Sequence, residues 1–330
     1  MGARTLASAL IPTLAVLGML FAAPVWESGL TAQAGASGDA LETIEVRPNI
    51  FAIVGAGGNV VVQVGPEGAI LVNSGSAAMA DKVLAAVKAL TPKPIRYIIN
   101  TADDADVAGG NAALSAAGVT LNRAAFNVGA TGATILAREE ILLRMSGGTA
   151  FGAEAWPTET FTARQRSMYL NGDGIQIMHM PAAHTDGDSI VMFRRADVIV
   201  AGDIVDLRRF PVIDLERGGS IQGEINALNR LIDLTIPPMP FVWHEDRTML
   251  VPGRGHVADQ ADLVEYRDMV TIVRDTIQDL IGKGMTIEQV KAANPTAGYR
   301  TRYGSDAGTW TTDKFVEAVY TGLKGSKGGS

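Results

Sequence analysis

The 330-residue sequence contains no cysteine. This excludes disulfide bridges, cysteine-ligated zinc or iron–sulfur centres and a thiol nucleophile. Histidine is also scarce, with only His179, His184, His244 and His256 in the whole chain. Any site that needs several imidazole ligands must therefore draw on these four residues. Glycine and proline, at 37 and 14 residues, are too few for a low-complexity chain, so we expect a globular protein.

The sequence also lacks a basic run. Lys and Arg number 28 against 35 Asp and Glu, which gives a formal net charge of −7. Because nucleic-acid binding needs clustered basic residues, we expect no nucleic-acid partner. Hydrophobic residues make up 47% of the chain, enough for a large core, and no linker-like stretch divides the chain into independent domains.

The N-terminal segment has the features of a secretory signal. A basic residue, Arg4, precedes an apolar stretch over residues 6–26, and Ala32-Gln33-Ala34 supplies the small-x-small pattern of a cleavage site. We expect cleavage after Ala34 and a mature protein that is periplasmic or secreted. The alternative is an uncleaved anchor, because the apolar run approaches spanning length. Only in that case would the chain contact a membrane, through this segment.

Two groups of short strands, each followed by helices, indicate two mixed β-sheets packed face to face with helices outside. Glycine-rich turns separate β-rich runs within residues 44–73, which is hairpin spacing. Pro252-Gly253 is expected to lie in a loop. The predicted helices cover residues 77–90, 109–117, 133–145, 222–234 and 262–281.

Residues 98–111, Ile-Ile-Asn-Thr-Ala-Asp-Asp-Ala-Asp-Val-Ala-Gly-Gly-Asn, resemble the signature of the metallo-β-lactamase superfamily. In that family a strand ends in Asn-Thr, and His-x-His-x-Asp-His and Gly-Gly-Asn follow. Further segments resemble family motifs in the family's order: residues 70–75, 181–189, 200–203 and 251–256. The resemblance spans residues 44–260 and implies an α/β fold of the metallo-β-lactamase type, an αββα sandwich.

Together, the N-terminal pattern, the resemblance and the C-terminal composition predict four parts of the chain. We expect residues 1–34 to be the signal peptide and residues 35–260 the metallo-β-lactamase-like domain. Residues 261–324 resemble the C-terminal extension of exported hydrolase-like members, and we expect this helical extension to pack on the same domain. Residues 325–330 are expected to be a disordered tail, because they are rich in glycine, serine and lysine.

The resemblance also implies seven metal-ligand positions, and the sequence departs from the family at several of them. The positions of the first metal hold Ala102, Asp104 and His184, and those of the second hold Asp106, Val107, Asp203 and Arg254. Asp106, His184 and Asp203 match the family, and Asp104 replaces histidine with a carboxylate. Ala102, Val107 and Arg254 mark lost ligand positions. Because metal affinity depends on the number of ligands, we expect this loss to weaken binding by several powers of ten.

Arg254 changes the electrostatics as well as the ligand count. A fixed positive charge repels a metal ion, and it can take the ion's place by pairing with Asp106 or Asp203. The alternative is an Arg254 side chain turned outward into solvent. Asp106 has a structural alternative too, because an Asp at this place can cap the following helix.

A rebuilt single-metal site is the second possibility. His256 lies two residues beyond Arg254, so a shifted loop would bring it inward. It would then complete a carboxylate-rich set of ligands: Asp104, Asp106, His184, Asp203 and His256. Such a set suits one Zn²⁺, Mn²⁺ or Fe²⁺ ion. His179 and His244 are expected to be ordinary packed or surface histidines.

Two functions follow from these alternatives. The first is a binding or structural protein, without catalysis or a metal cofactor, that serves as an accessory subunit with protein partners in the cell envelope. The second is a single-metal hydrolase of lactam, thioester or lactone substrates. In that case Asp106 would be the catalytic residue that orients or deprotonates a metal-bound water.

We expect the full-length chain, produced in a Gram-negative host, to be recovered from the periplasm with Gly35 as its N-terminal residue. Intact-mass spectrometry of the periplasmic fraction measures this directly. A matched variant with Ala32→Leu and Ala34→Leu removes the small residues that a signal peptidase accepts, and it should stay uncleaved. Recovery of the unmodified chain at full length in the membrane fraction would instead support the anchor.

Overall fold

The computed structural model describes residues 1–2, 40–121, 132–238 and 247–327. Residues 38–330 form one compact unit. The predicted signal segment lies outside the described residues, apart from its first two. Among the described residues, no helix is both long enough and apolar enough to cross a bilayer.

One mixed sheet contains seven strands in sequential order. The first four strands are antiparallel neighbours, and the last four run parallel to one another. The strands are β1 (Glu42–Arg47), β2 (Ile50–Ala56), β3 (Gly58–Gln63), β4 (Ala69–Val72), β5 (Ile95–Ile99), β6 (Thr134–Arg138) and β7 (Glu159–Phe161).

The second sheet contains five strands in the order β12-β11-β10-β9-β8. Its strands are β8 (Gln165–Leu170), β9 (Asp173–His179), β10 (Ser189–Phe193), β11 (Val198–Asp206) and β12 (Met249–Arg254). The pair of β11 and β12 is parallel, and the other neighbours are antiparallel. Because β11 and β12 run in the same direction, the side chains at their C-terminal ends lie at one edge of this sheet.

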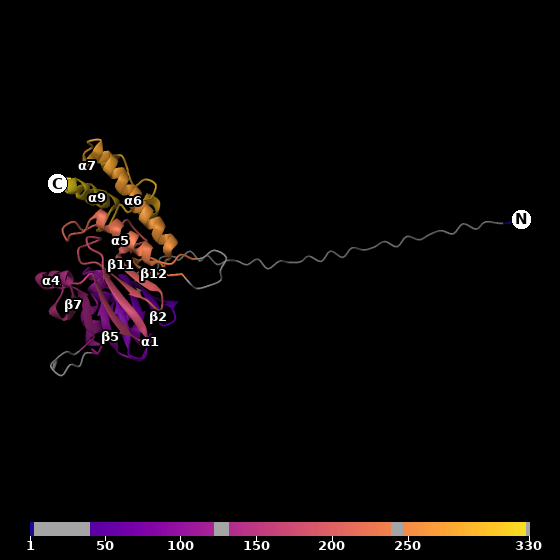
Figure 1. Cartoon of the computed structure of the whole chain (residues 1–330), viewed down its shortest axis with the longest axis vertical. Helices are drawn as coiled ribbons and strands as arrows, with labels where there is room; N and C mark the ends of the chain where they lie inside the picture. Colours follow the sequence, from indigo (N-terminus) through magenta and orange to yellow (C-terminus); the bar gives the residue numbers. More distant parts are fainter. Residues whose placement is uncertain (3–39, 122–131, 239–246, 328–330) are drawn as a thin grey trace. The chain divides into compact units, whose positions relative to one another are not determined.

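Three large apolar clusters hold the sheets and helices together, as expected for an αββα sandwich. Figure 1 shows the later helices gathered beside β11 and β12. One cluster joins the first sheet to the helices outside it, for example Ile98 to Val83 and Leu114. A second cluster lies between the sheets, and a third joins the second sheet to the later helices. The helices are α1 (Ala80–Leu90), α2 (Ala105–Ala108), α3 (Asn111–Ala116), α4 (Glu139–Gly147), α5 (Ile221–Leu234), α6 (Gln260–Gly282), α7 (Ile287–Ala292), α8 (Arg300–Tyr303) and α9 (Thr312–Lys327).

Two local predictions are wrong. Residues 133–145 form β6 and then α4 rather than one helix. The reason is that β6 is a parallel strand between two others, buried on both faces, and such a strand is as continuously apolar as a buried helix. Pro252-Gly253 lies within β12 rather than in a loop. This edge strand can include a proline because one side of it has no neighbouring strand.

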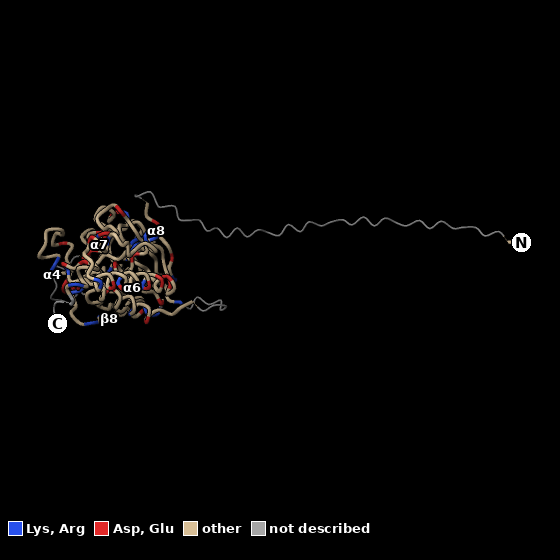
Figure 2. The backbone as a smooth tube through the Cα atoms, turned by 90° about the horizontal axis from the view of Figure 1, so that it is seen from above, with Lys and Arg blue, Asp and Glu red and all other residues tan. Residues whose placement is uncertain are grey.

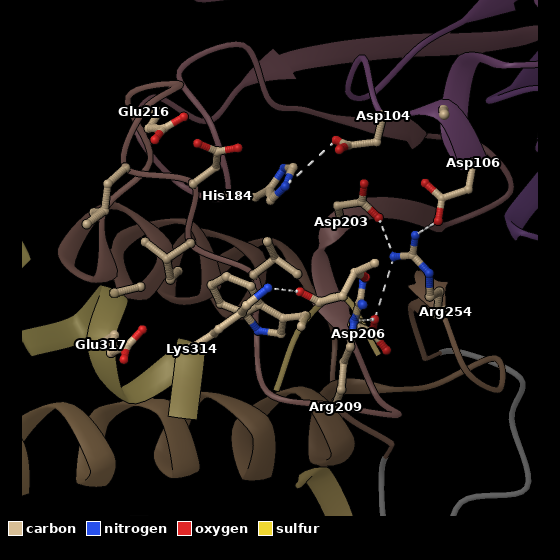
Figure 3. Close-up of a pocket in the computed structure, with 18 of the residues that line it drawn as sticks. Asp104, Asp106, His184, Asp203, Asp206, Arg209, Glu216, Arg254, Lys314 and Glu317 are labelled. Atoms are coloured by element: carbon tan, nitrogen blue, oxygen red, sulfur yellow. Dashed lines mark hydrogen bonds and ion pairs between the residues drawn. The ribbon is translucent and has the colours of Figure 1, made fainter. Parts of the chain in front are cut away.

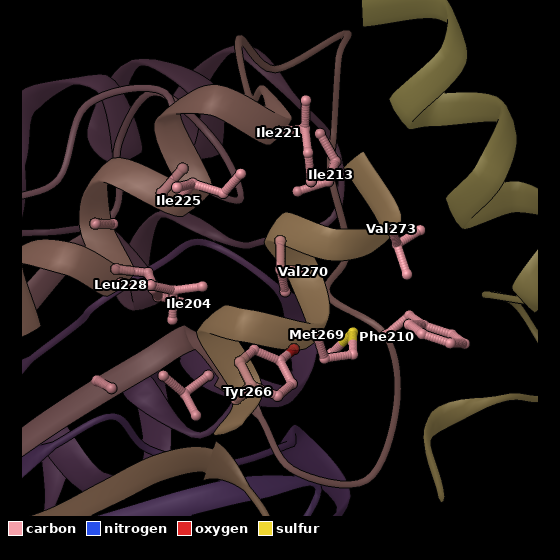
Figure 4. Packing of buried hydrophobic residues seen from close by; sticks show 14 of the residues in the cluster. Ile204, Phe210, Ile213, Ile221, Ile225, Leu228, Tyr266, Met269, Val270 and Val273 are labelled. Carbon is pink, nitrogen blue, oxygen red and sulfur yellow. The ribbon is translucent and has the colours of Figure 1, made fainter. Parts of the chain in front are cut away.

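The C-terminal helices share the core of the second sheet. Tyr266, Met269 and Val270 of α6 are fully buried and lie beside Phe210 and Leu228 (Figure 4). Helix α9 continues to Lys327, so the expected disordered tail is wrong for residues 325–327. A helix anchored by buried residues such as Val319 gains one hydrogen bond for each further residue, which extends it past the polar sequence. Residues 328–330 lie outside the described residues.

Charged residues are distributed without separation of sign. Figure 2 shows acidic and basic positions interspersed along the described backbone, including the length of α6. Several exposed charges pair with neighbours, such as Arg302 with Glu265 and Lys291 with Glu317. Pairs of this kind contribute little to stability, so the buried clusters carry most of the folding free energy.

The attachment of α9 predicts a large effect of one core substitution. Phe315 is fully buried, and its ring stacks on Phe210 at a centroid distance of 4.8 Å. Phe315→Ala should lower the free energy of unfolding by about 3–5 kcal/mol, because it leaves a cavity in the shared core. Tyr169→Ala, at a side chain that is 73% exposed, is the control. Equal urea midpoints for the two variants would contradict this packing.

Candidate functional site

The candidate site lies where the loops after β5 and β9 meet the ends of β11 and β12. The loop after β5 carries Asp104 and leads into α2, which holds Asp106. The loop between β9 and β10 carries His184, and β11 and β12 bring Asp203 and Arg254 to the same sheet edge. All five residues line a cavity of about 820 Å³ (Figure 3). The chain therefore brings five of the seven ligand positions implied by the resemblance together in one cavity.

The Arg254 guanidinium lies among three carboxylates. Its Nη1 donates to Asp203 Oδ1 at 2.9 Å and lies 3.6 Å from Asp206 Oδ2. Its Nη2 donates to Asp106 Oδ2. The side chain is 15% exposed, so the alternative of an outward arginine is wrong. Charge-assisted bonds to two carboxylates hold this guanidinium at the position that the family's motif gives to a metal ligand.

A second group of side chains lies beside Arg254. Ligand atoms of Asp104, His184 and Asp203 lie within 4.8 Å of one another. The His184 Nε2 is 3.7 Å from Asp104 Oδ2, and its Nδ1 is 3.3 Å from Asp188 Oδ1. Asp188 in turn accepts the backbone N–H of Thr185 at 2.6 Å. This loop therefore fixes the orientation of the buried imidazole ring.

The charges around His184 shift its proton affinity. Burial alone lowers the pKa of the imidazole, but the Asp188 carboxylate, with Asp203 and Asp104, outweighs it and raises this pKa to about 10. Burial raises the pKa of Asp203 to about 7, against the opposing effect of His184. Burial lowers the pKa of Arg254, but a guanidinium starts so high that it stays charged. At neutral pH the cavity therefore holds an imidazolium and a guanidinium.

Two more arginines fix the acidic loop after β5. Arg217 Nη2 donates to Asp104 Oδ1 at 2.9 Å, and its Nε donates to Asp214 Oδ2 at 2.7 Å. Arg144 binds both oxygens of Asp103, at 2.9 and 2.8 Å. Opposite charges of this kind hold a loop without a metal ion.

Two of the three lost ligand positions hold apolar side chains. Ala102 and Val107 are both buried, and neither lines the cavity. The helix-cap alternative for Asp106 is wrong. Asp104 holds the N-cap position of α2 and makes no side-chain cap bond, whereas the Asp106 carboxylate bonds Arg254.

His256 lies away from the cavity, in contrast to the predicted rebuilt site. Its side chain is 53% exposed, and its Nε2 lies 3.6 Å from Asp262 Oδ2 at the start of α6. Gly255 has a φ of +111°, a turn that directs the next residue away from β12. His179 bonds the carbonyl oxygen of Asp186 at 2.7 Å. His244 lies outside the described residues.

The residues present do not fit a dinuclear metal centre. Two of the positions for a second ion are Val107, which has no donor atom, and Arg254, whose charge repels a cation. For a first ion three donors remain, Asp104, His184 and Asp203. Arg217 and Arg254 already donate to the two carboxylates of this set. The geometry thus fits one ion at most.

Several residues of the site were not found from the sequence. Asp188 follows His184 by four residues, and this spacing alone is a signal that a side chain orients the ring. Arg217 and Arg144 lie 113 and 41 residues from the carboxylates they bind. No local pattern points to such distant pairs. Arg209, bound to Asp206 at 2.7 Å, and Lys314 also line the cavity.

A buried carboxyl group lies behind the site, on α5. Glu224 is fully buried, and neither of its side-chain oxygens has a hydrogen-bond partner among the described residues. Burial raises the pKa of Glu224 well above its ordinary 4.5, and the charge of Asp188 adds to this effect. The folded protein therefore holds this group in its neutral form, since an unpaired buried charge is far more costly.

Glu224→Gln should change how stability depends on pH. Below pH 4.5, the ordinary value, both the folded and the unfolded Glu224 carry a proton, so the variant and the parent should respond alike. Above it only the unfolded side chain ionises, so the parent loses about 1.4 kcal/mol per pH unit relative to the variant until the folded pKa is reached. Urea unfolding across the pH range measures this. Glu154→Gln, at an exposed position, is the control, and parallel curves for parent and Glu224→Gln would refute the prediction.

Comparisons with known proteins agree with the fold. The family model of the Metallo-beta-lactamase superfamily matches residues 53–244. Among solved structures, a metallo-beta-lactamase from Pontibacter korlensis has 16% identity and a TM-score of 0.54, covering 70% of this chain and 99% of that one. No curated protein matches.

Two further similar structures are sulfatases. A double mutant of the sec-alkyl sulfatase PisA1 has 13% identity and a TM-score of 0.63. The stereoselective inverting sec-alkylsulfatase Pisa1 from Pseudomonas sp. has 14% identity and a TM-score of 0.60. Each comparison covers 85% of this chain and 50% of the sulfatase, so this chain spans about half of their length. At these identities the likeness shows the fold alone, and together with the family match over residues 53–244 it shows that the chain belongs to the metallo-beta-lactamase superfamily.

Proposed function

We propose that this chain is a non-hydrolytic binding protein of the superfamily, in which Arg254 takes the place of the second metal ion. One observation carries the proposal: the guanidinium donates to Asp203 at 2.9 Å and also to Asp106. Both residues are ligand positions of the second metal in the resemblance. A metal ion bound at these carboxylates would compete with the guanidinium for their oxygens, and the two positive charges would repel.

The chemistry of the pocket supports binding rather than hydrolysis. Hydrolysis in this arrangement needs a water made nucleophilic by a metal ion. Asp106, the residue expected to deprotonate that water, is engaged by Arg254. The cavity nevertheless keeps about 820 Å³ of space, within the range of small-molecule sites. The chain thus retains a pocket and lacks the parts that would activate water in it.

The second candidate is a hydrolase with one metal ion. The observation that favours it is the close set Asp104, His184 and Asp203, which would hold the ion through two carboxylates and one imidazole. A Zn²⁺, Mn²⁺ or Fe²⁺ ion there would supply Lewis acidity for a lactam, thioester or lactone. Against it stand the bonds that Arg217 and Arg254 already make to both carboxylates, and the positive charge of the imidazole.

The cellular setting belongs to the same proposal. We infer export to the periplasm from the N-terminal signal features, and a role as an accessory subunit with a protein partner in the cell envelope. The N-terminal pattern supports export. The intact scaffold with altered ligand positions supports a binding role.

Metal analysis of the purified mature chain, grown with zinc, manganese and iron supplied, should find well below one ion per chain. A variant with Ala102→His, Asp104→His, Val107→His and Arg254→His restores the ligand types of the family and should gain zinc. Arg254→Gln removes the charge without adding a strong ligand, so it should stay metal-poor and serves as the control. Circular dichroism confirms that each variant folds.

The contrary outcome is equally specific. One ion per parent chain that disappears on His184→Ala would establish the single-metal site and refute the metal-free proposal. If Arg254→Gln alone gained zinc, the remaining ligands would be sufficient to bind an ion. The arginine would then only block a working metal site.

A further inference from the structure

A second cavity, here called the α5 cavity, lies on the side of the five-stranded sheet that the later helices cover. Its volume is about 430 Å³, within the range of small-molecule sites. The lining comes from the start of β8, the end of β9 with the loop after it, and one side of α5. None of its lining residues lines the cavity around Arg254. The two cavities are therefore separate sites.

Helix α5 forms one wall of the α5 cavity. The residues that it contributes are spaced three and four apart, so they lie on one side of the helix and extend over about 10 Å: Gly223, Asn226, Ala227 and Arg230. Gly223 and Ala227 are buried, whereas Asn226 and Arg230 are exposed. A Cβ added at Gly223 would lie 1.8 Å from the carbonyl oxygen of Ala182. The helix is therefore held close to the loop after β9, and the border between its buried and exposed sides lines the cavity.

The inner part of the α5 cavity is apolar. Met178 and Met180 are each 5% exposed and belong to the same apolar cluster as Ala227. Methionine side chains are flexible and polarizable, so they adapt to apolar groups of different shape. Gln165 lies opposite Met178 in the register of β8 and β9. Because β8 is the edge strand of this sheet, no further strand of the described chain closes the cavity on that side.

The charge of the lining has one sign. Arg164, just before β8, and Arg230 both line the α5 cavity and are exposed, and neither guanidinium has a hydrogen bond or ion pair among the described residues. The lining contains no Asp or Glu, although the chain carries a net charge of −7. Asp233, on the next turn of α5, makes no ion pair with Arg230 among the described residues. The Nδ2 group of Asn226 adds a third donor without an acceptor there.

The acidic groups beside His179, another lining residue, are already bonded. Glu140 lies close enough to His179 for the two to interact electrostatically, and Arg138 donates to both of its carboxylate oxygens, at 2.9 and 2.6 Å. Asp186 accepts His179 Nε2 through its backbone carbonyl, and its carboxylate pairs with Arg144. The positive charge of the lining is therefore not cancelled by a bonded carboxylate.

We propose that the α5 cavity binds a small carboxylate with an apolar body. The acid group bonds the guanidinium groups of Arg164 and Arg230, whose planar fork matches a carboxylate. The apolar body lies against Met178, Met180 and Ala227 and removes them from water. A cation of the same shape would be repelled by the two arginines. A carboxylate without an apolar body would leave the inner part of the cavity unfilled.

Titration of the ¹⁵N-labelled mature chain, followed by NMR, tests the class. The probes are hexanoate, hexylamine as the cation with the same body, and acetate as the acid without the body. Hexanoate should shift the backbone amide signals of Met178, Met180 and Ala227 in a saturable way. It should bind about tenfold or more tightly than either analogue, because only hexanoate has both the acid group and the body. Absence of hexanoate binding, or equal binding of hexylamine or acetate, would overturn the proposal.

Substitutions at the cavity then locate the binding site. Arg164→Gln and Arg230→Gln should each weaken hexanoate binding about fivefold or more, because each removes charge-assisted hydrogen bonds to the acid group. Arg194→Gln is the matched control, since Arg194 is also exposed and without a partner among the described residues but lies outside this lining. Asn226→Trp places a large side chain at the cavity and should abolish binding. Affinity equal to that of the control in either arginine variant would refute the two-arginine site.

The outcome is independent of the metal question, because the two cavities share no lining residue. A chain that binds no hexanoate refutes this ligand class and leaves the proposed function standing. A chain with one tightly held ion refutes the proposed function and leaves the α5 cavity to be judged by the titration.

Discussion

The architecture of the site depends on how a buried carboxylate is neutralised. Asp203, in the second half of β11, is 6% exposed, and a charge taken out of water is costly unless a partner of opposite charge is fixed beside it. In the family's motif that partner is a metal ion, whereas in this chain it is the Arg254 guanidinium, which bonds Asp203 and Asp106 together. A planar fork with several donors suits two carboxylates at once, because its N–H groups are already arranged in fixed directions. One substitution thus supplies the charge that the loops require.

The same solution recurs around the cavity. Arg217 holds Asp104 and Arg144 holds Asp103, so three separate arginines fix the acidic loop after β5 and the strand ends. Because these bonds are made within the chain, the loops are held without an added ion. Preorganised polar groups cost little to arrange when a ligand binds. A shaped pocket can therefore persist in this fold without a dinuclear metal centre.

The parts of this arrangement that sequence reasoning predicted are those encoded by local motifs. The Asn-Thr strand end, the Gly-Gly-Asn helix start and the order of later segments predicted the sandwich, and one of two alternatives for Arg254 matches its orientation. The alternative of a rebuilt site needed His256 to turn inward, but a turn at Gly255 directs it outward. The pairing of Arg217 with Asp104 joins residues 113 positions apart. Such a contact depends on how the loops are packed, which no short pattern encodes.

The C-terminal segment contributes residues to the cavity that the family motifs do not include. Residues 261–324 resemble an extension, yet Lys314 and Trp310 line the cavity that the motif residues form. They are brought there because Phe315, at the start of α9, stacks on Phe210, a few residues beyond the end of β11. One apolar contact therefore sets both the position of the helix and the side chains that it adds to the cavity. Because the lining comes from the family's loops and also from α9 and the segment before it, the shape of the cavity depends on both parts of the fold.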